Sequence, residues 1–287
     1  MADPFEALRP DDRTVPVGPD PEFAASLLAR LTRALSFPRG VTVSDLHMEE
    51  TTTVARSGDI AYVSAWVGDV ERAVAFYGSV LGWSFREAER PGSRQTEGVR
   101  PHHGVAQWSG EPTLFVCYLV DNLEEALSKV TAAGGTFEPP TDEPWGLTAQ
   151  CRDNQGMALA LYQPPAGQWP ARWAVNGERQ GDVSYVTMHV VDSTLAREFY
   201  GSVLGWTFSP GHVEDGWGPD DVSVMVGMGG GSSSMSCSAM YRVDDIQSAV
   251  ERVRAAGGTA TDPQTRPYGL QSECHDDQGM HFWLGQH

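Results

Sequence analysis

Apolar residues along the chain follow two periods: alternation in short runs, and a helical spacing in the longer stretches between them. After Asp121, Leu123, Leu127 and Val130 recur at the spacing of one helix face. Glu124 lies at the capping-box position of this predicted helix, and paired glycines further on supply a left-handed cap. Short runs of strand character broken by turn residues follow. The segment therefore predicts a strand, a helix and then several strands.

This arrangement occurs four times. The residues that open the four predicted helices are Asp69, Asp121, Asp192 and Asp244, each after an apolar strand pattern. Their spacings of 52, 71 and 52 residues place the extra length in the middle of the chain.

A long internal repeat groups the four units into two pairs. The string Phe-Tyr-Gly-Ser-Val-Leu-Gly-Trp occupies 76–83 and again 199–206, an offset of 123 residues. The offset holds without a gap from 58 to 286, and a period of this size is a duplicated domain, because solenoid repeats run to about 20–50 residues. We therefore expect one domain at 58–163, a linker at 164–180 and a second domain at 181–287.

Residues 1–57 form an extension before the repeats. Within it, residues 20–37 predict an amphipathic helix, because Asp20 can cap its start and Pro21 suits its first position. The apolar stripe of this helix consists of Phe23, Leu27, Leu31 and Leu35. The stripe either docks on the chain's own domains or serves as an oligomer contact or partner-binding arm.

The net charge and the composition of the chain exclude some classes of binding partner. The net charge of −18 argues against nucleic acid and anionic membranes, because both need a basic protein surface. No apolar stretch approaches the roughly 20 residues that span a bilayer, and the N-terminus lacks a signal-peptide pattern. We therefore expect a cytoplasmic protein. The four cysteines, at 117, 151, 237 and 274, have no C-x-x-C spacing and predict free buried thiols.

The repeated motif carries a resemblance to a known family. After the first strand of each copy, at 69–85 and 192–208, the chain reads D-x-x-x-A-x-x-F-Y-G-x-V-L-G-W. It thereby resembles the vicinal oxygen chelate superfamily, the group of glyoxalases, bleomycin-resistance proteins and extradiol dioxygenases. The resemblance implies an α+β fold of two tandem domains, each built from two paired βαβββ units. It also implies that the copies pack as two subunits of a homodimer would, so that the chain is a pseudo-dimer.

In metal-dependent members, the resemblance implies His or Glu ligands at fixed strand positions. The residues at the three positions that align well are Tyr62 and Tyr185, Phe115 and Ser238, and Ala160 and Trp283. None is a side chain that Zn, Ni, Fe or Mn normally selects. We therefore expect no family-type metal site and no cofactor, although a register error of one or two residues would reopen a divalent metal site.

The fourth ligand position falls in the last strand of each first half. In the first copy the neighbouring candidates are His102, His103 and Glu97, whereas Met225 and Val226 are the gap-free equivalents of the two histidines in the second copy. One imidazole without partner ligands does not make a metal site. We therefore interpret His102 and His103 as a surface or loop pair.

Strand alternation assigns side chains to the face that would surround the pocket. In copy one this face gathers aromatic and apolar residues, which suit a flat or hydrophobic ligand. Ordinary core packing without an open pocket is the alternative. In copy two, His189 and His281 come from different units and replace Trp66 and Ala158. The two imidazoles either form an acid–base pair near neutral pH or are satisfied core histidines.

Three functional hypotheses follow. The first is a metal-independent small-molecule-binding protein similar to the bleomycin-resistance branch, whose partner is a small hydrophobic or aromatic molecule. Its predicted ligand-binding residues are Tyr62, Trp66, Phe115, Cys117, Tyr185, Met240 and Trp283. The second is a lyase, isomerase, dioxygenase-type or tailoring enzyme acting on a small metabolite, with His189 and His281 as catalytic residues or a divalent metal at a shifted register. The third is a regulatory module that uses the helix at 20–37, and a homo-oligomer stays open in each case.

Overall fold

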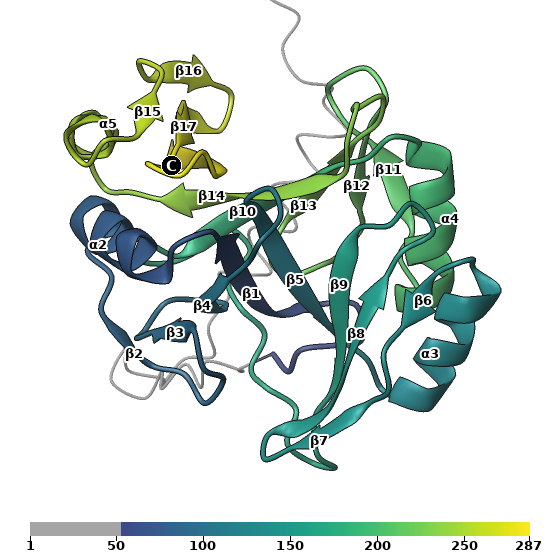
Figure 1. Cartoon of the computed structure of the whole chain (residues 1–287). Helices are drawn as coiled ribbons and strands as arrows, with labels where there is room; N and C mark the ends of the chain where they lie inside the picture. The colour runs from purple at the N-terminus through teal and green to yellow at the C-terminus, as the bar shows by residue number, and fades with distance from the viewer. Residues whose placement is uncertain (1–52) are drawn as a thin grey trace, which may run out of the picture. The chain divides into compact units, whose positions relative to one another are not determined.

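The computed structural model describes residues 53–287. The predicted helix at 20–37 and most of the extension therefore lie outside the described residues. Two nine-stranded sheets form the described part, one from each copy of the repeat (Figure 1). No helix within 53–287 is long and apolar enough to cross a membrane. The predicted α+β fold of two tandem domains is confirmed.

The first sheet has the strand order β2-β3-β4-β1-β5-β9-β8-β6, with β7 paired to β8. Its strands are β1 Ile60–Val67, β2 Phe85–Glu87, β3 Ser93–Thr96, β4 His102–Gln107, β5 Thr113–Leu119, β6 Thr136–Phe137, β7 Thr141–Glu143, β8 Gly146–Arg152 and β9 Ala158–Gln163. The central strand β1 runs parallel to β4 and antiparallel to β5, which joins the two βαβββ units of the domain into one sheet.

The second sheet repeats this topology as β11-β12-β13-β10-β14-β18-β17-β15, with β16 paired to β17. Its strands are β10 Val183–His189, β11 Phe208–Pro210, β12 Gly216–Pro219, β13 Val226–Gly229, β14 Ser236–Arg242, β15 Thr259–Ala260, β16 Gln264–Arg266, β17 Gly269–His275 and β18 His281–Gln286. All four cysteines are free and buried, as their spacing predicted.

Four helices cover one face of the sheets. They are α2 Val70–Leu81, α3 Leu123–Ala132, α4 Ser193–Leu204 and α5 Ile246–Ala255. Asp69 and Asp192 cap α2 and α4 as predicted. The predicted caps of the other two helices are wrong by one residue, because Asn122 and Asp245 accept the backbone N–H groups there. The shift moves the capping-box position of α3 from Glu124 to Glu125, and a glutamine from the last strand of each domain accepts from the first helical N–H, at Leu123 and Ile246.

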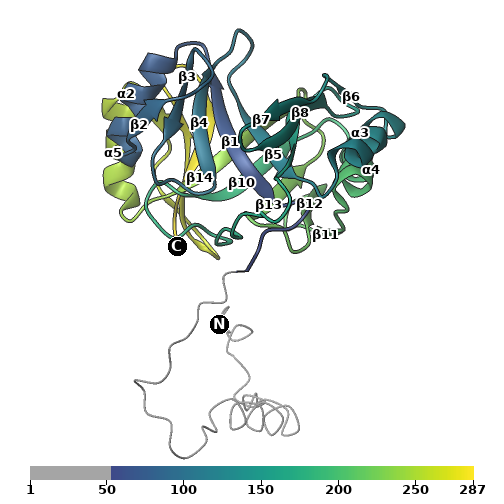
Figure 2. The same ribbon diagram turned by 90° about the horizontal axis from the view of Figure 1, so that it is seen from below.

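The helices also join the domains to each other. Helix α2 packs against α5 of the other domain and α3 packs against α4, an arrangement visible in two perpendicular views (Figures 1 and 2). One continuous hydrophobic core spans both domains. Within it the Tyr77 hydroxyl donates to Asp276 at 3.3 Å, and its repeat equivalent Tyr200 donates to Asp153 at 3.2 Å. The domains are therefore related as the two halves of a pseudo-dimer.

The repeated motifs make the contacts of this interface. In the Leu-Gly-Trp motif, Gly82 adopts the left-handed conformation that ends α2, and Trp83 then donates its indole N–H to the Gly181 carbonyl of the other domain. Trp206 donates in the same way to Gly58. The Gln-Gly-Met motif supplies Gln155, whose amide accepts from the Asp192 backbone N–H at 2.8 Å and donates to its carbonyl at 2.9 Å.

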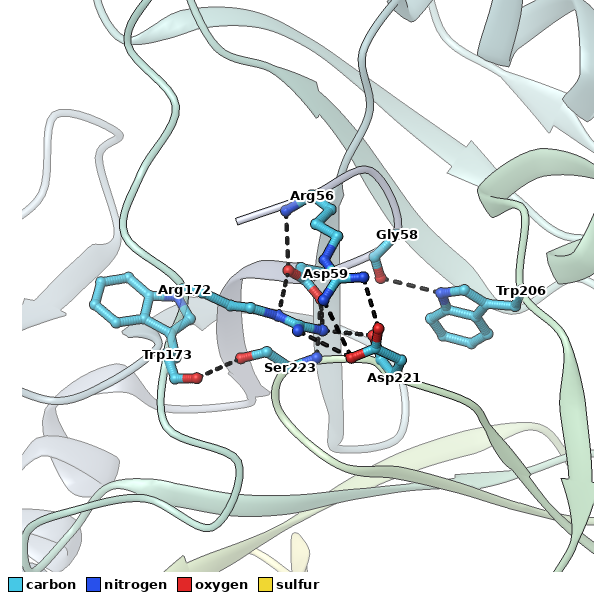
Figure 3. A network of polar contacts seen from close by, with 8 residues as sticks. All are labelled: Arg56, Gly58, Asp59, Arg172, Trp173, Trp206, Asp221 and Ser223. Atoms are coloured by element: carbon cyan, nitrogen blue, oxygen red, sulfur yellow. Dashed lines mark hydrogen bonds and ion pairs between the residues drawn. The ribbon is translucent and has the colours of Figure 1, made fainter. Parts of the chain in front are cut away.

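A polar network fastens the linker where the chain enters the first domain (Figure 3). Asp59 is 3% exposed and accepts two hydrogen bonds from the Arg172 guanidinium, at 3.0 and 3.2 Å. It also accepts from the backbone N–H groups of Arg56 and Ser223, each at 2.9 Å. Arg172 and Arg56 both reach Asp221 on the second domain. The linker is therefore held against both domains by one buried carboxylate.

Candidate functional site

The faces of the two sheets that carry no helices hold the predicted site residues. In the first domain, Phe115, Cys117 and Ala160 form a small cluster apart from the main core, with Tyr62 and Trp66 packed against it. This grouping is the one that strand alternation predicted. We call the two surfaces the helix-free faces of the first and second domains.

Stacked rings fill the helix-free face of the first domain. Trp66 stacks on Phe115 with ring centres 4.3 Å apart and planes 9° from parallel. Trp108 also packs against Trp66, with ring centres 4.5 Å apart and planes tilted by 37°. Cys117 lies beneath this stack, and burial raises the pKa of its thiol to about 12, so the group is an inert apolar neighbour. The alternative of ordinary core packing fits this face.

The second domain replaces the stack with polar side chains. Register across β10, β14 and β18 places Ser238 between Thr187 and His281 in one row. Ser238 occupies the position that Phe115 has in the first domain. Because the serine is smaller, the rings of His189 and His281 approach each other across Ser238, with ring centres 6.0 Å apart. Ser238 is 1% exposed, and its hydroxyl has no hydrogen-bond partner among residues 53–287. The structure therefore brings the two predicted histidines together.

Two residues of β17 complete this group. Glu273 accepts a hydrogen bond from His281 Nε2 at 3.1 Å, and His275 packs on the His281 ring with centres 5.1 Å apart. His275 ends strand β17 directly opposite His281. Trp283 lies edge-on to His281 at 5.2 Å. We call His189, Glu273, His275, His281 and Trp283 the histidine cluster.

Burial controls the charge of the histidine cluster. It lowers the pKa of His281, and the positive charges that His275 and His189 would carry act in the same direction, whereas Glu273 opposes them. Burial also lowers the pKa of His189, again against Glu273. Both imidazoles are therefore neutral at pH 7 and offer hydrogen-bonding nitrogens rather than positive charges.

Hollows lie on both sides of the described sheets. A cavity of about 50 Å³ lies beside the histidine cluster. Its lining residues are Thr261, Gln264, Arg266, Gln271, Glu273 and Trp283. A larger groove of about 590 Å³ lies on the helical side of the first domain, between α3 and the hairpin of β7 and β8. Both hydroxyls that line this groove, on Ser128 and Thr131, already donate to carbonyls of their own helix. The smaller cavity is lined mostly by polar side chains, whereas the groove is lined mostly by apolar ones.

The remaining predicted ligand-binding residues line the same faces. Tyr62 is half-buried, and its hydroxyl accepts a hydrogen bond from Gln95 at 3.0 Å. Tyr185 is half-buried in the second domain, where Met240 pairs with it across β10 and β14 and is itself buried. Burial raises the pKa of both tyrosine hydroxyls, so each remains protonated at neutral pH.

The strand positions at which the resemblance implies metal ligands carry tyrosine, phenylalanine, serine, alanine and tryptophan side chains here. Strand β4 places Gly104 beside Ser64, on the face of Tyr62, and a Cβ added at Gly104 would overlap the Tyr62 hydroxyl. Gly227 and Tyr185 repeat this arrangement in the second domain. In each domain a tyrosine side chain therefore lies over this glycine and leaves no space for a side chain there. Within residues 53–287, no three His, Cys, Asp or Glu side chains are grouped to hold a metal ion. These residues do not fit a family-type metal centre.

The interpretation of His102 and His103 as a surface pair is wrong for His103. Its ring is fully buried at the domain interface, where Nε2 lies 3.0 Å from the Tyr241 hydroxyl and the ring packs on Trp83. Burial lowers its pKa to about 3, so the ring is a neutral core group. Alternation along β4 turns it away from the face of Tyr62. His102 is exposed and lies edge-on to Trp173.

Sequence reasoning missed Glu273. The signal was available, because counting outward from the Asp276–Gly279 turn pairs Glu273 with Trp283 on one face of an antiparallel hairpin. The equivalent residue in the first domain is Gln150, which also marks the difference between the copies. Trp108 was missed because it lies just beyond β4, outside any alternating run.

Comparison with known proteins agrees with this architecture. Residues 59–161 match the family model described as the Glyoxalase/Bleomycin resistance protein/Dioxygenase superfamily. The first domain therefore belongs to this superfamily, and the second domain repeats the same motifs and topology, which fits a tandem arrangement. No curated protein sequence matches the chain significantly.

Several solved structures share the fold over most of the chain. A catechol 2,3-dioxygenase is 15% identical with a TM-score of 0.61, covering 81% of this chain and 89% of its own. The Mn(II)-bound glyoxalase from Novosphingobium aromaticivorans is 17% identical with a TM-score of 0.61, covering 81% and 83%. A 2,2',3-trihydroxybiphenyl 1,2-dioxygenase from Sphingomonas wittichii is 16% identical with a TM-score of 0.59, covering 82% and 91%. At these identities the likeness shows the fold alone.

Proposed function

We propose that the chain binds a small, flat apolar or aromatic molecule on the helix-free face of its second domain, without a metal at the family's ligand positions. The observation that carries the proposal is the difference between two copies of one surface. In the first domain Trp66 stacks on Phe115 and packs against Trp108, so that the three rings fill the face. In the second, a half-buried Trp283 and neutral imidazoles surround the unpartnered Ser238 hydroxyl.

This arrangement suits recognition of a small ligand. Trp283 offers an aromatic edge and face for a flat body, and such contacts contribute about 0.5–1.5 kcal/mol beyond burial alone. A few polar atoms then fix the orientation, as in most small-molecule sites. The chain's net charge of −18 disfavours an anionic ligand.

Paired variants in a thermal-shift screen of aromatic compounds test the proposal. A compound present at about 100 times its Kd stabilises the folded chain by roughly 2.7 kcal/mol, which raises the melting temperature measurably. The shift should persist in Trp66→Ala and in the presence of a chelator, and should disappear in Trp283→Ala, each measured against the variant's own ligand-free value. Loss of the shift in Trp66→Ala, or no shift with any compound, contradicts the proposal.

The histidine cluster favours a second candidate function. His281 with Glu273 resembles a base and its orienting carboxylate, which suits a lyase or isomerase that moves a proton on a small metabolite. In that case His189→Ala and His281→Ala should abolish turnover of a substrate that the wild-type chain converts. An unchanged rate in both variants removes this candidate.

A further inference from the structure

We infer that Glu273 and His281 form a proton-accepting dyad, in which Glu273 fixes the imidazole tautomer and His281 Nδ1 receives a neutral O–H or N–H donor of the ligand. The inference rests on the proposed function, because it names the chemical class of molecule that the second domain takes. Glu273 acts through His281 and is a positioning residue.

The hydrogen bond between the two side chains determines the tautomer. Glu273 Oε1 lies 3.1 Å from His281 Nε2, and a carboxylate can only accept. Nε2 therefore carries the proton in the neutral ring, and Nδ1 keeps its lone pair. Within residues 53–287 Nδ1 has no hydrogen-bond partner. The side chain of His281 is 25% exposed, so this acceptor is open to a ligand.

The register explains why the dyad forms. Glu273 stands opposite Trp283 on β17 and β18, which makes it a diagonal neighbour of His281 on the same face. In the first domain the equivalent residues are Gln150 and Ala158, so no such dyad exists there. The dyad is thus a property of the second domain and distinguishes it from the filled face of the first.

The surroundings favour a neutral donor over an anion. The titratable groups in contact with His281 are His189 from β10 and His275 and Glu273 from β17, and Arg266 from β16 lines the cavity beside Glu273. Strands β13 and β14 contribute glycine, serine and methionine to this face. A carboxylate on the ligand would be repelled by the Glu273 carboxylate, whereas an O–H or N–H group can donate a hydrogen bond to the lone pair of His281 Nδ1.

The same geometry permits a proton transfer. When the ligand's X–H bond breaks, the proton bonds to Nδ1 and the electron pair stays on X. The imidazolium that results is stabilised by the Glu273 carboxylate at Nε2. Protons and charge balance within the dyad and the ligand, so no further reactant takes part.

The tautomer can be measured in the free protein. In full-length chain with ¹⁵N-labelled histidine, NMR at neutral pH should show His281 as the Nε2–H form, with its signals assigned through His281→Leu. Glu273→Ala should lower the ratio of Nε2–H to Nδ1–H forms on the order of five-fold, the effect of one partly exposed charged hydrogen bond. Glu273→Gln, whose amide oxygen still accepts, should restore the ratio, and Glu251→Ala on the exposed side of α5 should leave it unchanged. A dominant Nδ1–H form, or an unchanged ratio in Glu273→Ala, overturns the dyad.

A matched pair of probes tests the ligand class separately. Phenol and anisole share a flat aromatic body and differ in the O–H donor. NMR titration should show phenol binding on the order of ten-fold more tightly than anisole, about one net hydrogen bond, with the difference lost in His281→Leu. Equal binding of both probes at this face overturns the donor class while leaving the binding function in place. Absence of binding by either probe contradicts the proposed function, and the tautomer measurement then decides the dyad by itself.

Discussion

Replacing Arg172 with alanine tests whether the buried Asp59 network stabilises the two-domain unit. The guanidinium is 14% exposed and Asp59 is 3% exposed, so the pair is largely shielded from water. Removing one partner of a buried ion pair costs about 3–5 kcal/mol, because the other charge remains buried. Asp59 keeps two backbone N–H donors, from Arg56 and Ser223, which places the cost at the lower end, about 3 kcal/mol.

The loss is measurable by both chemical and thermal unfolding. For a unit of this size each kcal/mol corresponds to about 2–4 °C, so Arg172→Ala should lower the melting temperature by roughly 6–12 °C. The midpoint of unfolding in guanidinium chloride should fall. The slope m should stay constant, because the surface area exposed on unfolding does not change.

A neighbouring arginine provides the control. Arg56, like Arg172, pairs with Asp221. In this second pair, however, the Arg56 side chain is 53% exposed and the Asp221 side chain is 62% exposed. Arg56→Ala should therefore cost far less than Arg172→Ala, because water screens the exposed pair. Equal losses in the two variants, or a loss in Arg172→Ala below about 1 kcal/mol, would refute the assignment of stability to the buried pair.

Three further predictions concern the interface and the covered metal positions. Burial raises the pKa of Asp276, so the contribution of this carboxyl group to stability is lost as pH rises through that pKa. The free energy of unfolding of Asp276→Asn at pH 7 should therefore match or exceed that of the wild type, and a lower value would contradict this. Gln155→Ala removes two hydrogen bonds to Asp192 and should lower the free energy of unfolding, measured in urea, by about 1–2 kcal/mol. An unchanged free energy of unfolding would contradict this prediction. Gly104→Ala should destabilise the chain, and less so in a Tyr62→Phe background, with a coupling of about 0.5–3 kcal/mol; additive effects would show that the tyrosine does not cover this strand position.

Much of the fold was predictable from the sequence because repetition and alternation are local patterns. The offset of 123 residues predicted two copies, and alternation along β1 and β5 grouped Tyr62, Trp66 and Phe115 correctly. The failures arose where distant segments meet. His103 was assigned to the surface because nothing local shows that Tyr241, 138 residues away, lies against it.

The same limit applied to the candidate site. His189 and His281 were predicted as a pair because strand alternation places both on one face. Glu273 was missed although it lies only eight residues from His281, because the two come together only when the hairpin register is counted outward from the turn between β17 and β18. The role of Arg172 in the linker was also beyond local patterns, since Asp59 and Asp221 come from different domains.

Mapping where a small aromatic ligand binds is the most direct test of the central claim, that the second domain alone keeps a working site. We would titrate a compound from the screen into isotopically labelled full-length chain, with a chelator present, and follow the indole and imidazole signals by NMR. The account predicts perturbed signals for Trp283 and His281 and unchanged signals for Trp66 and Trp108. Perturbations on the Trp66 side, or binding that the chelator abolishes, would contradict it.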